Sequence, residues 1–207
     1  MNFSQQDAEL LLDIIKARRD VRGNRFISKE VEKENIELIL EAAISAPSVG
    51  YSQPWKFVII ESQNIKEEIL ANYESENNKA KKVFDENDLY SKLKLEGIKE
   101  APINIAVLYE PSEEPILGMT SMGKMGEYSV VCAIQNMWLM ARSLNIGIGW
   151  VSILDEAKVL HSIDAPKNSQ LIAYLCIGYV DEFYSQSELK TLKWEREKLL
   201  QECIIAR

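Results

Sequence analysis

Three arginines crowd into five residues near the N-terminus, in the order Arg18-Arg19-Asp20-Val21-Arg22. Their positive charges repel one another unless an anion neutralises them, and the planar guanidinium fork suits the oxygens of a phosphate. The same residues follow a helical pattern, however, and cations also complement the negative end of a helix. Taken alone, the segment therefore supports an anion site and a structural helix end equally.

A conformationally restricted loop is expected over residues 46–55, which hold two prolines and a glycine. It presents the Ser48 hydroxyl and the Gln53 amide beside an aromatic ring, Trp55. Such donors and acceptors suit a flat heterocycle that bears several carbonyl and nitrogen atoms. Taken alone, a tight structural loop with Trp55 in the core is the better interpretation.

The third unusual stretch is a strand-like segment, residues 147–153, that contains two glycines. Glycines weaken a strand interior, so Gly147 and Gly149 indicate close approach by another backbone or by a ligand. Ser152 follows, and its hydroxyl or backbone N–H could face that ligand. A dinucleotide fingerprint is disfavoured, because Ser152 occupies its third glycine position and no helix follows directly.

Several classes of catalytic site find no support in the sequence. The one histidine, His161, has an ordinary amphipathic setting, which argues against a histidine-based triad or a zinc site, and no metal site is predicted. There is no Cys-x-x-Cys pair and no phosphate-binding Walker loop. A formal charge of −8 disfavours nucleic acid and anionic membranes as partners.

The expected location is the cytoplasm. We see no signal peptide, and the apolar stretches are broken well short of a membrane span. The odd number of cysteines and their apolar neighbours predict buried, reduced thiols at Cys132, Cys176 and Cys203.

The elements that must position these residues follow from periodicity. Residues 8–16 carry apolar side chains at helical spacing, with Ser4 suited to cap the helix and Asp7 in its first turn. A second helix over 31–45 should end before Pro47. Further helical patterns cover one or two exposed helices within 65–98, a helix over 156–162 and the start of the tail 187–207.

A long helix over 128–144 is apolar on nearly every side, which is typical of a helix buried all round. It is expected to be either central to the domain or shared across a subunit interface. Short apolar runs predict strands over 56–61, 103–109, 146–154 and 171–180. The order of elements predicts one domain over residues 1–207, an α+β sandwich with a single central sheet.

Together, the three stretches resemble the nitroreductase superfamily. The shared features are Arg-Arg-x-x-Arg after the first helix, Pro-Ser-x-x-x-Gln-Pro-Trp in the loop, and a glycine-rich strand after a long apolar helix. Asp20 stands where most nitroreductases have serine. A closer resemblance is to the 5,6-dimethylbenzimidazole synthases, which make the lower ligand of vitamin B12. It rests on this aspartate, on residues 94–102 and 132–138, and on Gly149-Trp-Val-Ser152. The resemblance covers residues 11–184.

The resemblance implies a central mixed β-sheet flanked by helices, in an interlocked homodimer with flavin mononucleotide (FMN) at the subunit interface. The arginine segment would hold the phosphate and ribityl end, the loop would approach the flavin ring, and Leu93 would belong to a cover over the site. The implied FMN-binding set is Arg18, Arg19, Asp20, Val21, Arg22, Ser48, Gln53, Leu93 and Ser152.

In this subfamily reduced FMN is the substrate, and O2 converts it to 5,6-dimethylbenzimidazole and a four-carbon sugar phosphate. The implied catalytic residues are Asp20, as a base at the ribityl carbon that neighbouring arginines keep ionised, and Ser152, near flavin N5. A separate flavin reductase could supply the reduced FMN. Two alternatives are a general FMN-dependent NAD(P)H nitroreductase and a flavin-storage protein without activity.

The chain also departs from the family pattern. Phe26 follows the arginines at a different spacing, residues 72–87 diverge, and the tail around Lys193 and Arg196 matches weakly. No phosphate ligand is therefore assigned to the tail, and the conformation of the cover is not predicted.

Overall fold

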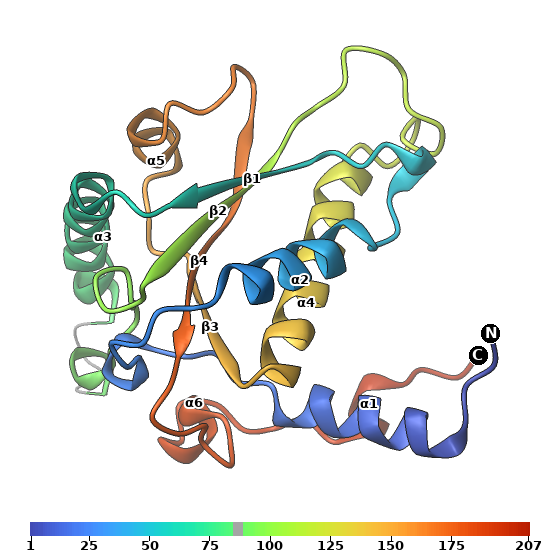
Figure 1. Ribbon diagram of the computed structural model, residues 1–207, viewed down its shortest axis with the longest axis horizontal. Helices are drawn as coiled ribbons and strands as arrows, with labels where there is room; N and C mark the ends of the chain where they lie inside the picture. The colour runs from blue at the N-terminus through green and yellow to red at the C-terminus, as the bar shows by residue number, and fades with distance from the viewer. Residues whose placement is uncertain (85–88) are drawn as a thin grey trace.

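The computed structural model describes residues 1–84 and 89–207, and a four-stranded sheet lies at its centre (Figure 1). The order across the sheet is β1-β2-β4-β3, and each neighbouring pair is antiparallel. A mixed sheet was expected, but within the described residues the parallel component is only an isolated bridge between Asp20 and Ile148. The strands are β1 (Trp55–Ile60), β2 (Ile103–Tyr109), β3 (Ile146–Val151) and β4 (Gln170–Tyr179).

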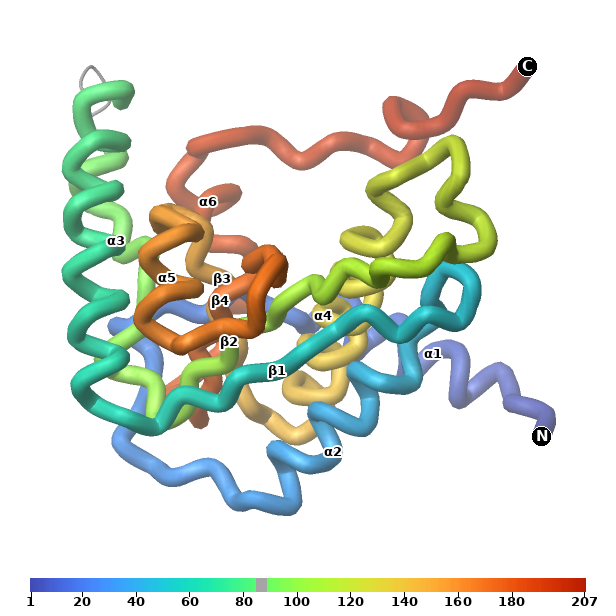
Figure 2. The backbone as a smooth tube through the Cα atoms, turned by 90° about the horizontal axis from the view of Figure 1, so that it is seen from above, coloured from blue at the N-terminus to red at the C-terminus, as the bar shows by residue number. Residues whose placement is uncertain are grey.

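Helices cover both faces of the sheet, as the α+β sandwich predicts. In both views α2 and α4 lie on one side of the strands, and α3 and α5 lie on the other (Figures 1 and 2). The helices are α1 (Gln5–Ala17), α2 (Lys33–Ile44), α3 (Gln63–Val83), α4 (Met125–Ser143), α5 (Glu156–Ser162) and α6 (Glu188–Thr191).

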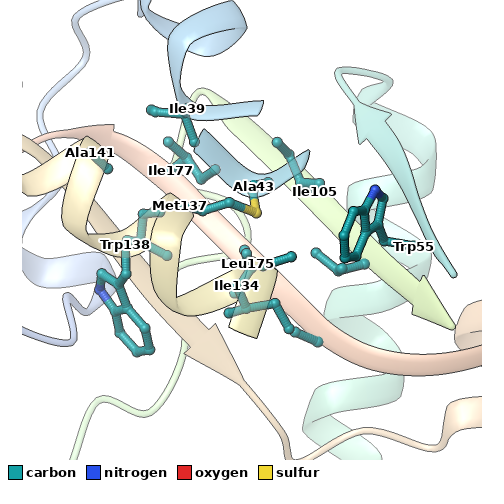
Figure 3. Packing of buried hydrophobic residues seen from close by; sticks show 14 of the residues in the cluster. Ile39, Ala43, Trp55, Ile105, Ile134, Met137, Trp138, Ala141, Leu175 and Ile177 are labelled. Atoms are coloured by element: carbon teal, nitrogen blue, oxygen red, sulfur yellow. The ribbon is translucent and has the colours of Figure 1, made fainter. Parts of the chain in front are cut away.

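Each face of the sheet has its own hydrophobic core. Ile39 of α2 and Met137 of α4 pack over Leu175 and Ile177 of β4 (Figure 3). Because side chains alternate along a strand, Cys176 points to the opposite face and joins the cluster beneath α3 and α5. This double burial explains why the strands read as continuous apolar runs.

Local signals set several element boundaries. The Ser4 hydroxyl accepts the Asp7 N–H at 3.3 Å and the Asp7 carboxylate accepts the Ser4 N–H at 2.7 Å, so the predicted cap is confirmed as a capping box. The helix over 156–162 and the strand over 103–109 match their predicted bounds. The region 65–98 contains one long helix, α3, with a buried face, and residues 85–88 lie outside the described part of the chain.

The expected burial is wrong for two of the three thiols and for a fully central α4. On α4 a stripe stays open, with Tyr128 49% and Val131 41% exposed, so the other expected setting, a helix shared across a subunit interface, stays a prediction. Helix α1 buries none of its residues. Cys132 on this stripe and Cys203 in the tail are exposed, so only Cys176 of the three thiols is buried. Among the described residues, no helix is long and apolar enough to cross a membrane.

The glycines of β3 mark a close backbone approach, as predicted. A β-carbon at Gly149 would collide with the carbonyl oxygen of Val21, and one at Gly147 would lie 2.8 Å from a Val21 methyl group. The Val21 N–H donates to the Ile148 carbonyl at 3.0 Å. The edge of β3 therefore receives the segment that follows α1.

We predict that Gly149→Ala lowers the free energy of unfolding by about 1–3 kcal/mol, because the new methyl group must displace backbone atoms of Val21. Gly123→Ala is the matched control, since a β-carbon there meets no atom within 4 Å. Urea denaturation of both variants measures the difference. Equal stabilities would contradict the close packing of Val21 on β3.

Candidate functional site

A cavity of about 200 Å³ lies between the arginine segment and the segment that follows β4. It brings together four of the nine predicted binding residues and adds five that the sequence did not indicate. The lining residues are Arg18, Arg19, Asp20, Arg22, Leu95, Tyr184, Ser187, Glu188 and Leu189.

The free edge of β3 positions the arginine segment. After α1 ends, Arg18 turns to extended backbone with φ −61° and ψ 134°. The Trp150 N–H then donates to Asp20 Oδ1 at 3.0 Å, next to the bond between Val21 and Ile148. Val21 thus contributes through its backbone, while Asp20 and its neighbours are held at the edge of the sheet.

Helix α4 holds the same segment from a second side. The Trp138 indole N–H donates to the Arg19 carbonyl at 3.1 Å, and Arg142 Nε donates to the Ala17 carbonyl at 3.1 Å. Carbonyl groups at the end of a helix lack partners within it, so the bond from Arg142 satisfies the end of α1, and the bond from Trp138 holds the residue after the helix cap. The arginine segment is therefore fixed between α4 and β3.

The three arginines have different surroundings. Arg22 pairs with the Asp20 carboxylate and donates to the Leu95 carbonyl at 3.1 Å. Arg19 donates to main-chain carbonyls, including those of Lys16 and Tyr184, and so serves the helix end. Arg18 has no ion pair among the described residues, and its guanidinium lies over an indole ring. Arg18 is therefore the arginine most available to an added anion.

Burial raises the pKa of the Asp20 carboxyl above its ordinary value, although Arg22, the Trp150 N–H and Arg18 act to lower it. Glu188 raises it further. The arginines were expected to keep Asp20 ionised, and they do act to lower its pKa, but the loss of water on burial outweighs their charge. A raised pKa makes the carboxylate a stronger proton acceptor.

Ser48 and Gln53 lie in the expected restricted loop, but this loop lies away from the arginine cavity. The Ser48 hydroxyl accepts the Gln53 N–H at 3.1 Å, and the Val49 N–H donates to Ser129 Oγ at 3.0 Å. Left-handed backbone at Tyr51 (φ 55°) and Gln53 (φ 47°) folds the loop sharply. Trp55 is buried in the core, as predicted.

The loop and the arginine segment lie at opposite ends of α4 (Figure 1). The loop contacts Ser129, whereas the arginine segment contacts Trp138. Nine residues of helix separate these contacts, about 14 Å along the axis. One chain therefore does not bring Ser48 and Gln53 to the arginine cavity.

Two other predicted residues lie outside the cavity lining. Ser152 is exposed directly after the end of β3, and Leu93 is half-buried at the end of a short 3-10 turn, Tyr90–Lys92. Leu95 lines the cavity instead. Tyr184, Ser187, Glu188 and Leu189 carried no sequence signal for this role. Trp138 lies in the segment 132–138 that resembles the synthases, but no function was predicted for it.

The chain matches the family model described as "Nitroreductase family" over residues 15–179. A 5,6-dimethylbenzimidazole synthase of Rhodospirillum rubrum is 38% identical over 185 residues, covering 87% of each chain. One of Rhodobacter capsulatus is 34% identical over 193 residues, covering 91% of this chain and 92% of the relative.

Solved structures share the fold. An oxidised iodotyrosine deiodinase bound to FMN and 3-iodo-L-tyrosine has a TM-score of 0.71 at 24% identity, covering 95% of this chain and 97% of that one. A nitroreductase from Desulfovibrio desulfuricans in complex with FMN has a TM-score of 0.68 at 21% identity, covering 95% and 96%. Sequence and fold agree, and the chain belongs to the nitroreductase family.

Proposed function

We propose that this protein is a 5,6-dimethylbenzimidazole synthase that consumes reduced FMN and O2 and releases a four-carbon sugar phosphate. The observation that carries the proposal is the Asp20 carboxylate inside an arginine-lined cavity. Hydride transfer at the flavin ring needs no carboxylate at the phosphate end, whereas fragmentation of the ribityl chain needs a base there. The relatives that bear this name support the assignment.

The cavity fits the phosphate end of FMN. Arg18 lacks an ion pair among the described residues, and Arg22 adds a second guanidinium beside it. Charge-assisted bonds from arginine to phosphate are among the stronger hydrogen bonds in proteins. About 200 Å³ is less than a ligand of this size usually fills, so the ring needs surface from elsewhere.

A second copy of the chain supplies that surface in the proposed homodimer. The open stripe on α4 includes Tyr128 and Val131, and α1 adds Leu11 and Ile15. Exposed apolar side chains of this kind mark an interaction site, and a two-fold pairing would cover them on both copies. The partner's loop would then bring its own serine and glutamine to the flavin ring.

When bound, reduced FMN supplies the reaction with O2 at its ring. Arg18 and Arg22 would hold the phosphate, and Asp20 would then accept a proton from the ribityl chain. The Trp150 N–H keeps one carboxylate oxygen of Asp20 oriented. Ser152 is assigned to the N5 side of the ring and Leu93 to the cover. The enzyme is cytoplasmic, and a separate reductase supplies reduced FMN.

A general FMN-dependent NAD(P)H nitroreductase is the second candidate. The ion pair between Asp20 and Arg22 favours it, because that aspartate would then serve only as a partner for arginine. Incubation of the protein with reduced FMN and O2, followed by chromatography, separates the two. The synthase loses flavin and forms a benzimidazole, whereas the nitroreductase returns FMN intact after many turnovers.

We predict that Asp20→Asn lowers fragmentation by about 10²–10⁴-fold, the usual contribution of a general base. The amide keeps the shape and removes the proton acceptor, so FMN still binds. Product formation and flavin titration measure the two effects. Asp164→Asn, at an exposed left-handed position that asparagine tolerates, is the control. Benzimidazole formation at the native rate by Asp20→Asn would exclude the base.

The double variant Arg18→Ala/Arg22→Ala should bind FMN more weakly by about 3 kcal/mol or more, taking about 1.5–3 kcal/mol for each charged hydrogen bond. Fluorescence titration measures the affinity. Lys33→Ala/Lys79→Ala removes the same charge from exposed sites outside the cavity and should leave the affinity unchanged. Equal affinities of the two double variants would refute the phosphate assignment.

For the homodimer, we predict a dimeric mass at micromolar concentration and a monomeric mass for Val131→Asp. A carboxylate on the open stripe of α4 would lose its water in the dimer interface without gaining a hydrogen-bond or ion-pair partner, and this would disfavour the dimer. Light scattering after size exclusion reports the mass, and circular dichroism checks that the variant folds. A monomeric native protein would rule out the interface.

A further inference from the structure

We propose that Trp138 is a positioning residue that orients Arg18 toward the phosphate of the flavin nucleotide. The inference rests on the proposed function only as far as FMN binding at the arginine cavity. It does not depend on whether FMN is then fragmented or returned intact.

One indole makes two separate contacts with the arginine segment. The Arg18 guanidinium carbon lies 4.9 Å from the centroid of the Trp138 ring, within the range of a cation–π interaction. The indole N–H donates to the Arg19 carbonyl at 3.1 Å. Trp138 is only 9% exposed and belongs to α4, where it joins the core cluster that α4 shares with α2. The ring is therefore a rigid support for both the side chain and the backbone.

Arg18 needs such a support more than its neighbours do. Arg22 is already oriented by the Asp20 carboxylate and the Leu95 carbonyl, and Arg19 by several main-chain carbonyls. Arg18 has no ion pair among the described residues, so the indole face is its main restraint. A free arginine side chain loses rotamer entropy when it is fixed. Orientation before binding removes part of that cost.

The same indole also packs against Trp150, which contacts the other charged residues of the arginine segment. Its ring lies 6.2 Å from that of Trp150, at an interplanar angle of 49°. The Trp150 N–H donates to Asp20, and its carbonyl accepts from Arg22 at 3.4 Å. The Trp138–Trp150 pair therefore underlies Arg18 and the Asp20–Arg22 ion pair together.

The experiment compares FMN with riboflavin, which lacks the phosphate. Titrations use the native protein, Trp138→Leu and Trp138→Phe, with Tyr174→Phe as the control at a buried aromatic residue on the opposite face of the sheet. We expect Trp138→Leu to weaken FMN by about 3- to 30-fold, the range of a cation–π contact, and riboflavin by less than about 2-fold. Trp138→Phe retains an aromatic face and should lie between Trp138→Leu and the native protein.

A second measurement repeats Trp138→Leu and Trp138→Phe in an Arg18→Ala background, where the loss in FMN affinity should disappear. A purely structural tryptophan would weaken FMN and riboflavin equally, or would act equally with and without Arg18. Either result overturns the proposal, as does an unchanged FMN affinity in both variants. If Trp138→Leu does not fold, the same comparison with Trp138→Phe decides.

The outcome is separable from the fate of the proposed function. Native protein that binds FMN but forms no benzimidazole defeats the synthase assignment and leaves the role of Trp138 intact. If the native protein fragments FMN but the Trp138 variants bind FMN and riboflavin as tightly as the native protein does, the synthase assignment stands and this inference is wrong.

Discussion

The pairing of the arginine segment with the open edge of β3 is the constraint on which the site depends. An edge strand presents unpaired N–H and C=O groups. Here Ile148 uses its carbonyl to hold Val21, and Trp150 uses its N–H to hold Asp20. Because Gly149 has no side chain, the two backbones can approach this closely. The charged groups thus derive their positions from main-chain bonds rather than from flexible side chains.

Those positions set the electrostatics of the cavity. Asp20 loses water on burial, which raises its pKa, and its ion pair with Arg22 recovers only part of that loss. Arg18 remains without an ion pair among the described residues, in a chain whose formal charge is −8. Asp20 is thus a stronger base than an exposed carboxylate, and it lies beside Arg18, which is available to bind a phosphate. This arrangement is suited to chemistry on the ribityl chain, which links the phosphate of FMN to its ring.

The sequence predicted features that depend on near neighbours and missed those that depend on distant ones. The Ser4 cap and the bounds of α5 follow from local chemistry, and the glycines of β3 predicted a close approach without identifying Val21 as the segment that approaches. The destination of the Arg19 side chain, on a carbonyl 165 positions along the chain, has no local signal. The place of Tyr184, Ser187, Glu188 and Leu189 in the cavity lining likewise has no local signal. The pKa of Asp20 was misjudged because charges are visible in a sequence whereas burial is not.

The proposed homodimer would explain both the open stripe on α4 and the separation of the loop from the arginine cavity. An apolar pattern cannot distinguish a helix buried in its own core from one buried against a second copy, so both settings were expected for the helix that carries Val131. The loop of Ser48 and Gln53 and the segment of Arg18 occupy opposite ends of that helix. In a two-fold dimer across α4, the loop end of one copy can lie beside the arginine end of the other, and two equivalent sites form together. Covering the stripe and completing the site are then a single event, so subunit association and flavin binding must stabilise each other.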